Sequence, residues 1–348
     1  MATAWFVLIV LMLIVYVLLD GFDFGVGILH LLVARTDEER RTVVGAIGPL
    51  WDGNEVWLIA AGGVSVFAFP RAYAAGFSGF YLALIFALWL LVVRALSIEF
   101  RSKEAHPLWR QAWDAGFFAS STAMAIILGA ALGNLVRGVP LDASGYFAGP
   151  LFTDWRPGPD PGVLDWYTVT VGLFALVVLA EHGALYLVWK TTGDVARRSR
   201  DVARRVRPLV AGLAVVVTAM TLAVQPLIRA NLARRPAAWP LAFLIAGGFA
   251  GSAVAERRGR ELAAFVAFGA FIAGLLGITA AMVYPDILIS THAATYSLTV
   301  HNAAAPASTL RIGFVWWSVA LVLAVGYFVH LFRSFAGKVA PGGGEHGY

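Results

Sequence analysis

Residues 5–30 read WFVLIVLMLIVYVLLDGFDFGVGILH, and this stretch decides the class of fold. Residues 5–19 carry no charge, and a helix that crosses a bilayer needs about 20 mainly apolar residues. A membrane barrel would instead show alternating segments of about ten residues. The stretch therefore predicts a spanning helix with Asp20 and Asp23 near one end. Because no basic segment precedes it and no small-residue cleavage pattern follows, we expect a retained helix rather than a signal peptide.

The composition of the whole chain points to lipid as its solvent. The 348 residues are 59% hydrophobic and 14% charged, whereas soluble domains have about 25% charged residues. The formal charge of +5 comes from short basic clusters between apolar runs, which is typical of membrane loops and not of a nucleic-acid-binding face. The absence of cysteine excludes disulfides, thiolate metal sites, iron–sulfur clusters and covalently attached haem.

Apolar runs predict nine membrane-spanning helices in a single polytopic domain, residues 1–336, followed by a disordered cytoplasmic tail, residues 337–348. The predicted spans cover residues 5–30, 52–70, 77–99, 114–136, 163–189, 208–228, 238–255, 261–284 and 312–333. Four spans precede a long loop rich in proline and glycine, and five follow it. We therefore expect an all-α integral membrane protein built as two four-helix bundles plus one peripheral helix.

The basic residues predict how the chain is oriented. The loops after the first, third, fifth and seventh spans, together with the tail, hold 18 of the 26 Lys and Arg residues, and the loops on the other side hold 7. The remaining one, Arg94, lies inside a span. Since cytoplasmic loops are enriched in Lys and Arg, we expect the N-terminus outside and the C-terminus in the cytoplasm.

Two carboxylates lie on one face of the first span. Asp20 and Asp23 are three residues apart, which places them together on a helix. Ionisable groups within spans usually face a bundle interior or a water-filled cavity. Two nearby carboxylates in a low dielectric cannot both ionise cheaply, which favours a group that takes up and releases protons. The alternative is that both acids lie hydrated at the headgroup boundary.

A second acidic cluster opens the second span, where residues 51–57 read WDGNEVW. Acidic side chains also suit a helix N-terminus as caps, and tryptophans also suit the membrane interface. Both acidic clusters fall on the same side of the membrane, however. Together, Asp20, Asp23, Asp52 and Glu55 predict an acidic mouth that collects cytoplasmic protons.

Arg94, Glu181 and His182 are further ionisable residues within predicted spans. Arg94 needs a carboxylate or carbonyl partner, and an ion pair that holds two helices together is the favoured interpretation. His182, beside Glu181, suggests a haem ligand, a proton relay or a helix–helix hydrogen bond. Haem usually needs a second axial group, and the other histidines fall at predicted helix ends, loops or the tail. We therefore expect no haem or metal in this chain, and a relay or structural role for Glu181 and His182.

Several motifs resemble the second subunit of the cytochrome bd-type quinol oxidases. Residues 20–27, DGFDFGVG, are similar to that family's Asp-Gly-Phe-Asp-x-Gly-x-Gly signature, and residues 51–58, WDGNEVWL, to its Trp-Asp-Gly-Asn-x-Val-Trp-Leu stretch. The resemblance spans most of the chain and is most specific through about residue 140. Further similar residues follow in order at Pro70, Tyr73, Phe77–Tyr81, Phe100–Lys103, Trp113, Asp114, Gly133 and Asn134.

The resemblance implies one subunit of an enzyme of bacterial or archaeal cytoplasmic membranes that oxidises quinol and reduces dioxygen to water. In such enzymes haem b and haem d belong to the larger subunit I, so this chain would be its heterodimer partner and scaffold, with no catalytic residue of its own. Small single-helix subunits, and in some members a bound quinone, are further implied partners.

The resemblance also implies roles for individual residues. Asp23 and Asp52 match the leading positions of a cytoplasmic proton path, with Asp20 and Glu55 next to them. The residues implied as supporting groups or quinone contacts are Trp51, Asn54, Trp57 and Arg101. Two alternatives remain: a secondary transporter that uses intramembrane carboxylates, although no inverted repeat is evident, and a purely structural membrane subunit.

Overall fold

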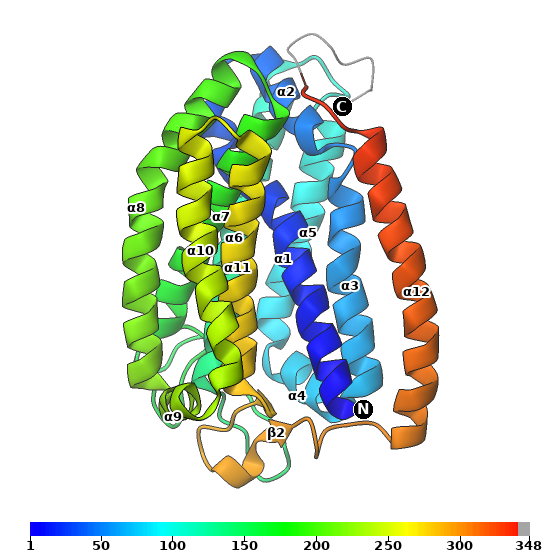
Figure 1. The fold of residues 1–348 in the computed structure, drawn as a ribbon, viewed down its shortest axis with the longest axis vertical. Coiled ribbons are helices and arrows are strands. Elements are labelled where there is room, and N and C mark those ends of the chain that lie inside the picture. Colours follow the sequence, from blue (N-terminus) through cyan, green and yellow to red (C-terminus); the bar gives the residue numbers. More distant parts are fainter. Residues whose placement is uncertain (340–348) are drawn as a thin grey trace.

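A computed structural model describes residues 1–339 as long helices that run side by side along one axis (Figure 1). The helices are α1 Ala2–Val33, α2 Asp37–Ile47, α3 Trp51–Ala68, α4 Pro70–Gly79, α5 Tyr81–Phe100, α6 Pro107–Arg137, α7 Trp166–Lys190, α8 Gly193–Val224, α9 Pro226–Arg234, α10 Trp239–Arg257, α11 Glu261–Val283 and α12 Ala307–Ser334. A short antiparallel pair, β1 Asp286–Leu288 and β2 Leu298–Thr299, and two 3-10 turns, Pro236–Ala238 and Ala294–Tyr296, complete the fold.

Within these residues, eight helices are long and apolar enough to cross a membrane: α1, α5, α6, α7, α8, α10, α11 and α12. The shorter α3 lies parallel to them (Figure 1), and Asp52 and Glu55 make its first turns more polar. The predicted class, an all-α integral membrane protein with about nine spans, is confirmed.

The helices form two groups with one outlying member. α1 contacts α3 and α6, and α5 packs on α6, whereas α7 contacts α8 and α11, and α10 packs on α11. α7 packs on both α6 and α1 and so joins the two groups, and α12 lies at the edge (Figure 1). In α12 only Leu310 is buried. This agrees with the predicted two bundles and peripheral helix.

Some helices differ from the predicted ranges for local reasons. The predicted span 77–99 is interrupted at Phe80, where α4 ends and α5 begins. α8 begins at Gly193, well before the predicted residue 208, because its arginine-rich start is charged yet has good helix propensity. α8 then ends before Pro226, where proline removes a backbone donor and starts α9.

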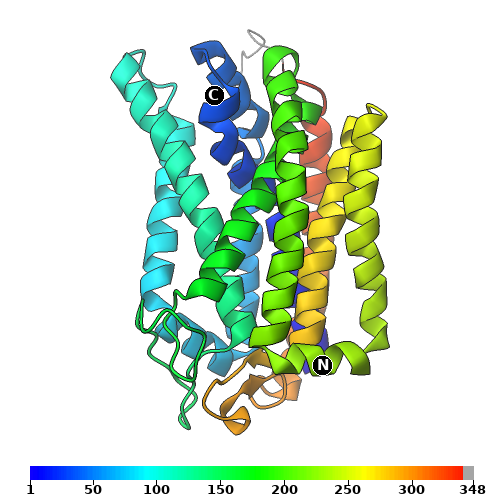
Figure 2. The same cartoon turned by 90° about the vertical axis from the view of Figure 1, so that its left-hand side faces the viewer.

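The two ends of the molecule differ. The end that we call the basic end carries α2, the α7–α8 corner and the end of α12, and the opposite end carries the N-terminus and the β-strands (Figures 1 and 2). The first residues of the predicted tail, 337–339, adjoin the basic end, where the Val339 amide donates to the Lys190 carbonyl (2.7 Å). Residues 340–348 of that tail lie outside the described part of the chain.

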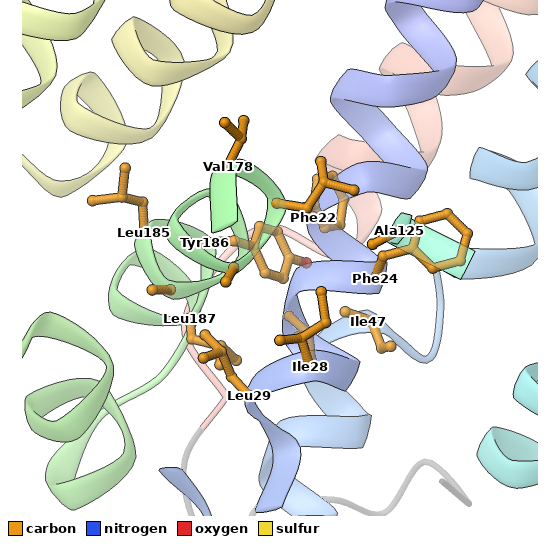
Figure 3. Close-up of a cluster of buried hydrophobic side chains, with 14 of the residues drawn as sticks. Phe22, Phe24, Ile28, Leu29, Ile47, Ala125, Val178, Leu185, Tyr186 and Leu187 are labelled. Atoms are coloured by element: carbon orange, nitrogen blue, oxygen red, sulfur yellow. The ribbon is translucent and has the colours of Figure 1, made fainter. Parts of the chain in front are cut away.

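Aromatic side chains pack closely where α1 meets α7. Phe22 stacks on Tyr186 with ring centroids 4.1 Å apart, and the Tyr186 hydroxyl donates to the Ala46 carbonyl (2.6 Å). Figure 3 shows Phe22 of α1 beside Tyr186 of α7, while Phe24 points to the other side of α1, next to Ala125 of α6. Asp20 and Asp23 lie in the same part of α1 and are fully buried.

Candidate functional site

One face of α1 carries a stripe of buried polar side chains. Tyr16, Asp20, Asp23 and His30 follow one another at intervals of four, three and seven residues, with Gly27 between the last two, which is the spacing of one helix face. All four side chains are buried. The stripe runs from the middle of α1 to the basic end, so it connects the core of the first bundle with that surface.

Asp20 is held by a buried cation. Arg94 of α5 donates from Nη1 to Asp20 Oδ1 at 2.5 Å, and its Nη2 lies 3.4 Å from Glu55 Oε2 of α3. The guanidinium also lies over the Phe24 ring, 4.2 Å from its centroid. Arg94 therefore joins three helices and compensates the charge of Asp20.

Asp23 has a different kind of partner. The Asn54 side-chain amide donates to Asp23 Oδ2 at 2.8 Å, and both side chains are fully buried. Asp23 Oδ1 has no hydrogen-bond partner among the described residues, and no cation is paired with this carboxylate there. A buried carboxylate without a cation is costly when ionised, so Asp23 is the acid of the stripe best suited to hold a proton.

A second cluster caps the stripe at the basic end, and we call it the Asp114 cluster. Asp114 of α6 lies 2.5 Å from His30 Nε2 and accepts hydrogen bonds from Arg40 (2.8 Å) and Arg101 (2.5 Å). Arg101 also donates to Asp37 at 2.9 Å. The cluster thus ties α1, α2, α5 and α6 together.

Asp37 belongs to α2, outside the spanning segments. Partial burial alone would raise the pKa of Asp37, but the hydrogen bond from Arg101 and the charges of Arg101, Arg110 and Arg41 outweigh it, so the pKa is lowered. Asp37 is therefore a fixed anion that attaches α2 to the first bundle.

Ser121 of α6 packs against the stripe between Asp23 and His30. A side chain at Gly27 would collide with the Ser121 hydroxyl, so this hydroxyl packs against α1 one turn from Asp23 and about one turn from His30. Its oxygen is buried and makes no hydrogen bond within the described chain. A hydroxyl both donates and accepts, which suits it to pass a proton between these residues.

The structure does not bring all the predicted residues together. Asp52 is exposed on the first turn of α3, whereas Asn54 and Glu55 turn toward the stripe. Trp51 is buried in the core, and the Trp57 ring packs 5.6 Å from Phe328 of α12. Arg101, also named as a supporting group or quinone contact, is held in the Asp114 cluster.

Glu181 lies in a separate cluster in the second bundle. Arg207 of α8 donates to Glu181 at 2.7 Å and to Glu256 of α10 at 2.6 Å. Arg204 donates to the other Glu256 oxygen at 2.8 Å. As in the first bundle, one arginine bridges carboxylates from two other helices.

His182 faces another way. Its Nε2 lies 3.0 Å from the Leu18 carbonyl, and its ring stacks on Phe265 with centroids 4.7 Å apart. In the described part of the chain no hydrogen bond links His182 to Glu181, so the structure shows no direct path for proton transfer between them.

His30, Asp114 and Ser121 were not predicted as site residues. Periodicity could have indicated His30, because it follows Asp23 by seven residues and so shares its helix face. Asp114 was noted only as part of a motif, because its contacts come from helices distant in sequence.

These features define a polytopic membrane protein in which arginines hold buried carboxylates between helices. The sequence model of the family described as "Cytochrome bd terminal oxidase subunit II" matches residues 1–335. The chain belongs to this family.

Individual relatives agree with this assignment. A "Cytochrome bd ubiquinol oxidase subunit 2" of Bacillus subtilis is 30% identical over 308 residues, 88% of each chain. A "Cytochrome bd-I ubiquinol oxidase subunit 2" of Escherichia coli is 38% identical over 200 residues, 56% of this chain and about half (50%) of that one. The solved "structure of bd oxidase from Geobacillus thermodenitrificans" has the same fold, with a TM-score of 0.72, 17% identity and coverage of 96% of this chain and 98% of that one.

Proposed function

We propose that this chain is the non-haem second subunit of a bd-type terminal oxidase, which couples quinol oxidation to the reduction of dioxygen to water. Membership of the subunit II family and the printed functions of the relatives support this. The chain itself supplies a scaffold and a route for protons, and its partner is the haem-bearing subunit I.

The buried histidines fit a subunit that leaves haem to its partner. His30 is engaged with Asp114, and His182 is engaged with the Leu18 carbonyl and packed on Phe265. In each ring Nε2 is engaged in this way and Nδ1 is buried, and packing against Phe117 and Phe265 restrains the two rings. Haem b and haem d in subunit I supply the electron transfer and oxygen chemistry.

Protons enter this chain at the basic end and move along α1. The single observation that carries this proposal is the pairing of fully buried Asp23 with a neutral amide instead of a cation. His30, Ser121 of α6 and Asp23 follow one another beside α1, and half-buried Glu55, next to the ion pair of Asp20 and Arg94, comes after them. Each of them can bind or pass a proton where a bare proton cannot be solvated.

The basic end faces the cytoplasm in this proposal. The excess of Lys and Arg in its loops supports that orientation. Protons taken from the cytoplasm and quinol protons released outside then separate charge across the membrane without a pump.

The exposed face of α3 is the proposed contact with subunit I. Asp52, Val56, Ile59, Gly63 and Val66 are exposed at helical spacing, and small residues such as Gly63 allow another helix to approach closely. A partner on this face would cover Asp52 beside half-buried Glu55. The route then leaves this chain through Glu55 and Asp52, so in this proposal Asp52 passes protons on to the partner and does not collect them from the cytoplasm as predicted.

The experiment is co-purification of the tagged chain from its native membrane, followed by an absorption spectrum and an oxygen-consumption assay with a quinol. We expect haem b and haem d bands and quinol-dependent oxygen uptake in the same fraction. A colourless chain that purifies alone and moves a solute across liposomes would overturn the proposal in favour of a transporter.

A further inference from the structure

Two adjoining hollows lie at the basic end of the second bundle, away from the polar stripe of α1. The first, of about 270 Å³, is lined by charged residues of α8, α10 and the start of α11, including Arg200, Arg204, Arg257 and Glu261. The second, of about 390 Å³, continues between α8 and α10. Arg204, Glu256 and Arg257 line both, so the two form one continuous site.

The hollows lie at the level where three helices change from charged to apolar. α8 carries its last charge at Arg207, α10 carries no charge before Glu256, and α11 carries none after Glu261. Such a change on neighbouring helices marks the boundary between headgroups and hydrocarbon. A molecule in this site would therefore have one end among lipid headgroups and the other among acyl chains.

The charged half of the site has unused donors. Arg204 uses only Nε in its hydrogen bond to Glu256. The side chain of Arg257 makes no hydrogen bond or ion pair to any residue within 1–339. A guanidinium presents five N–H donors in a planar fork that matches phosphate oxygens. Arg204, Arg207 and Arg257 outnumber Glu256 in the second hollow, so an anion is favoured there.

The remaining walls of the second hollow are apolar. They come from Pro208 and Ala211 of α8 and Phe249 and Ala253 of α10. A free inorganic anion would gain nothing from these walls, whereas an acyl chain would bury apolar surface against them. The first hollow adds Glu261 to Glu256. Carboxylates accept hydrogen bonds from hydroxyl groups but repel a second phosphate.

We propose that this site binds an anionic glycerophospholipid of the phosphatidylglycerol type in the leaflet at the basic end. Its phosphodiester lies between Arg204 and Arg257, its glycerol hydroxyls face Glu256 and Glu261, and one acyl chain follows Phe249 and Ala211. Because the lipid contacts both α8 and α10, it joins the outer helices of the second bundle. The proposal is independent of the proposed oxidase function.

The test uses the complex purified from its native membrane, stripped of lipid by detergent exchange and titrated in native mass spectrometry. The probes are palmitoyl-oleoyl phosphatidylglycerol, the matched phosphatidylcholine and glycerol phosphate, which lacks acyl chains. We expect a phosphatidylglycerol adduct that forms about tenfold more readily than the phosphatidylcholine adduct, as one or two charge-assisted hydrogen bonds would provide.

Arg257→Gln is the diagnostic variant and Arg258→Gln is its matched control. Both arginines are exposed and unpaired within the described chain, but only Arg257 lines the hollows. Arg257→Gln should remove most of the preference, and Arg258→Gln should leave it intact. The proposal would be overturned if both lipids bound equally or if both variants lost the preference for phosphatidylglycerol equally. It would also be overturned if glycerol phosphate displaced phosphatidylglycerol as effectively as the lipid itself does.

Discussion

The side-chain amide of Asn54 donates a 2.8 Å hydrogen bond to Asp23 in a fully buried site between α3 and α1. One turn away, Asp20 is paired instead with the Arg94 guanidinium. Two aspartates three residues apart thus have opposite electrostatic environments. Asp20 is suited to remain charged and hold helices together, and Asp23 is suited to exchange a proton.

The pair of Asp20 and Arg94 should be a stability element. Arg94→Gln leaves a buried carboxylate without its cation, which costs about 3–5 kcal/mol when one partner of a buried pair is removed. We expect a clearly lower thermal unfolding temperature for the purified complex.

The double variant Asp20→Asn with Arg94→Gln removes both charges and should recover a large part of that loss. If the stability loss of the double variant equals the sum of the losses in Asp20→Asn and Arg94→Gln, the two residues are not coupled.

The crossing of α1 and α7 depends on two glycines. A Cβ at Gly25 would overlap the backbone of Leu179 and Gly183, and a Cβ at Gly183 would overlap Gly25. Gly25→Ala should therefore lower stability by about 1–3 kcal/mol or more, as overpacking does, and reduce the yield of folded complex.

Gly212→Ala in α8 is the matched control, because nothing lies within 4 Å of its added Cβ. Its stability should be unchanged or slightly raised, since alanine is the better helix former. Thermal unfolding of both variants in one detergent provides the comparison, and equal stability of the two would contradict the proposed close crossing.

The attachment of α2 should depend on acid pH. Because the pKa of Asp37 is lowered in the folded protein, mainly by Arg101 against the effect of burial, ionised Asp37 contributes stability above its unfolded pKa of about 4. That contribution is lost as the pH falls through the lowered folded-state value. A spin label at exposed position 38 should therefore become more mobile only below about pH 4.

Asp37→Asn supplies the control for this measurement, because it removes the titrating group. The label in that variant should already be mobile at neutral pH and should respond less to acid. If the label in the chain that keeps Asp37 became mobile near pH 6, a group other than Asp37 would be responsible.

The Asp114 cluster should matter for proton delivery and not only for folding. His30→Gln keeps a polar side chain near Asp114 but cannot be protonated, so oxygen consumption of the assembled complex should fall several-fold while its haem spectrum stays unchanged. Exposed Glu38→Gln, at the same end and outside the cluster, should have normal turnover. A lost haem spectrum in His30→Gln would instead assign the residue a structural role.

Much of the fold could be predicted from local sequence. The uncharged run of residues 5–19 identifies a spanning helix by length and hydrophobicity alone, because lipid requires every backbone group to be satisfied within the helix. The start of α8 was missed for the converse reason: its arginines extend the helix beyond the membrane, where hydrophobicity carries no signal.

The site could be predicted only in part. Asp20 and Asp23 share a helix face, and that spacing is visible in the sequence. The partners that distinguish them, Arg94 and Asn54, come from α5 and α3, and tertiary packing alone decides which acid meets which. Asp52 lies two residues before Asn54 yet is exposed, because residues two apart on a helix do not share a face.

The central claim is that Asp23 carries protons to the oxygen-reducing partner. Oxygen consumption by the assembled complex of the Asp23→Asn variant is the most direct measurement, with the haem spectrum as the check on assembly. The account predicts turnover reduced at least about tenfold, within the range that proton-transfer groups contribute, and a normal spectrum. Near-normal turnover with a normal spectrum would contradict it.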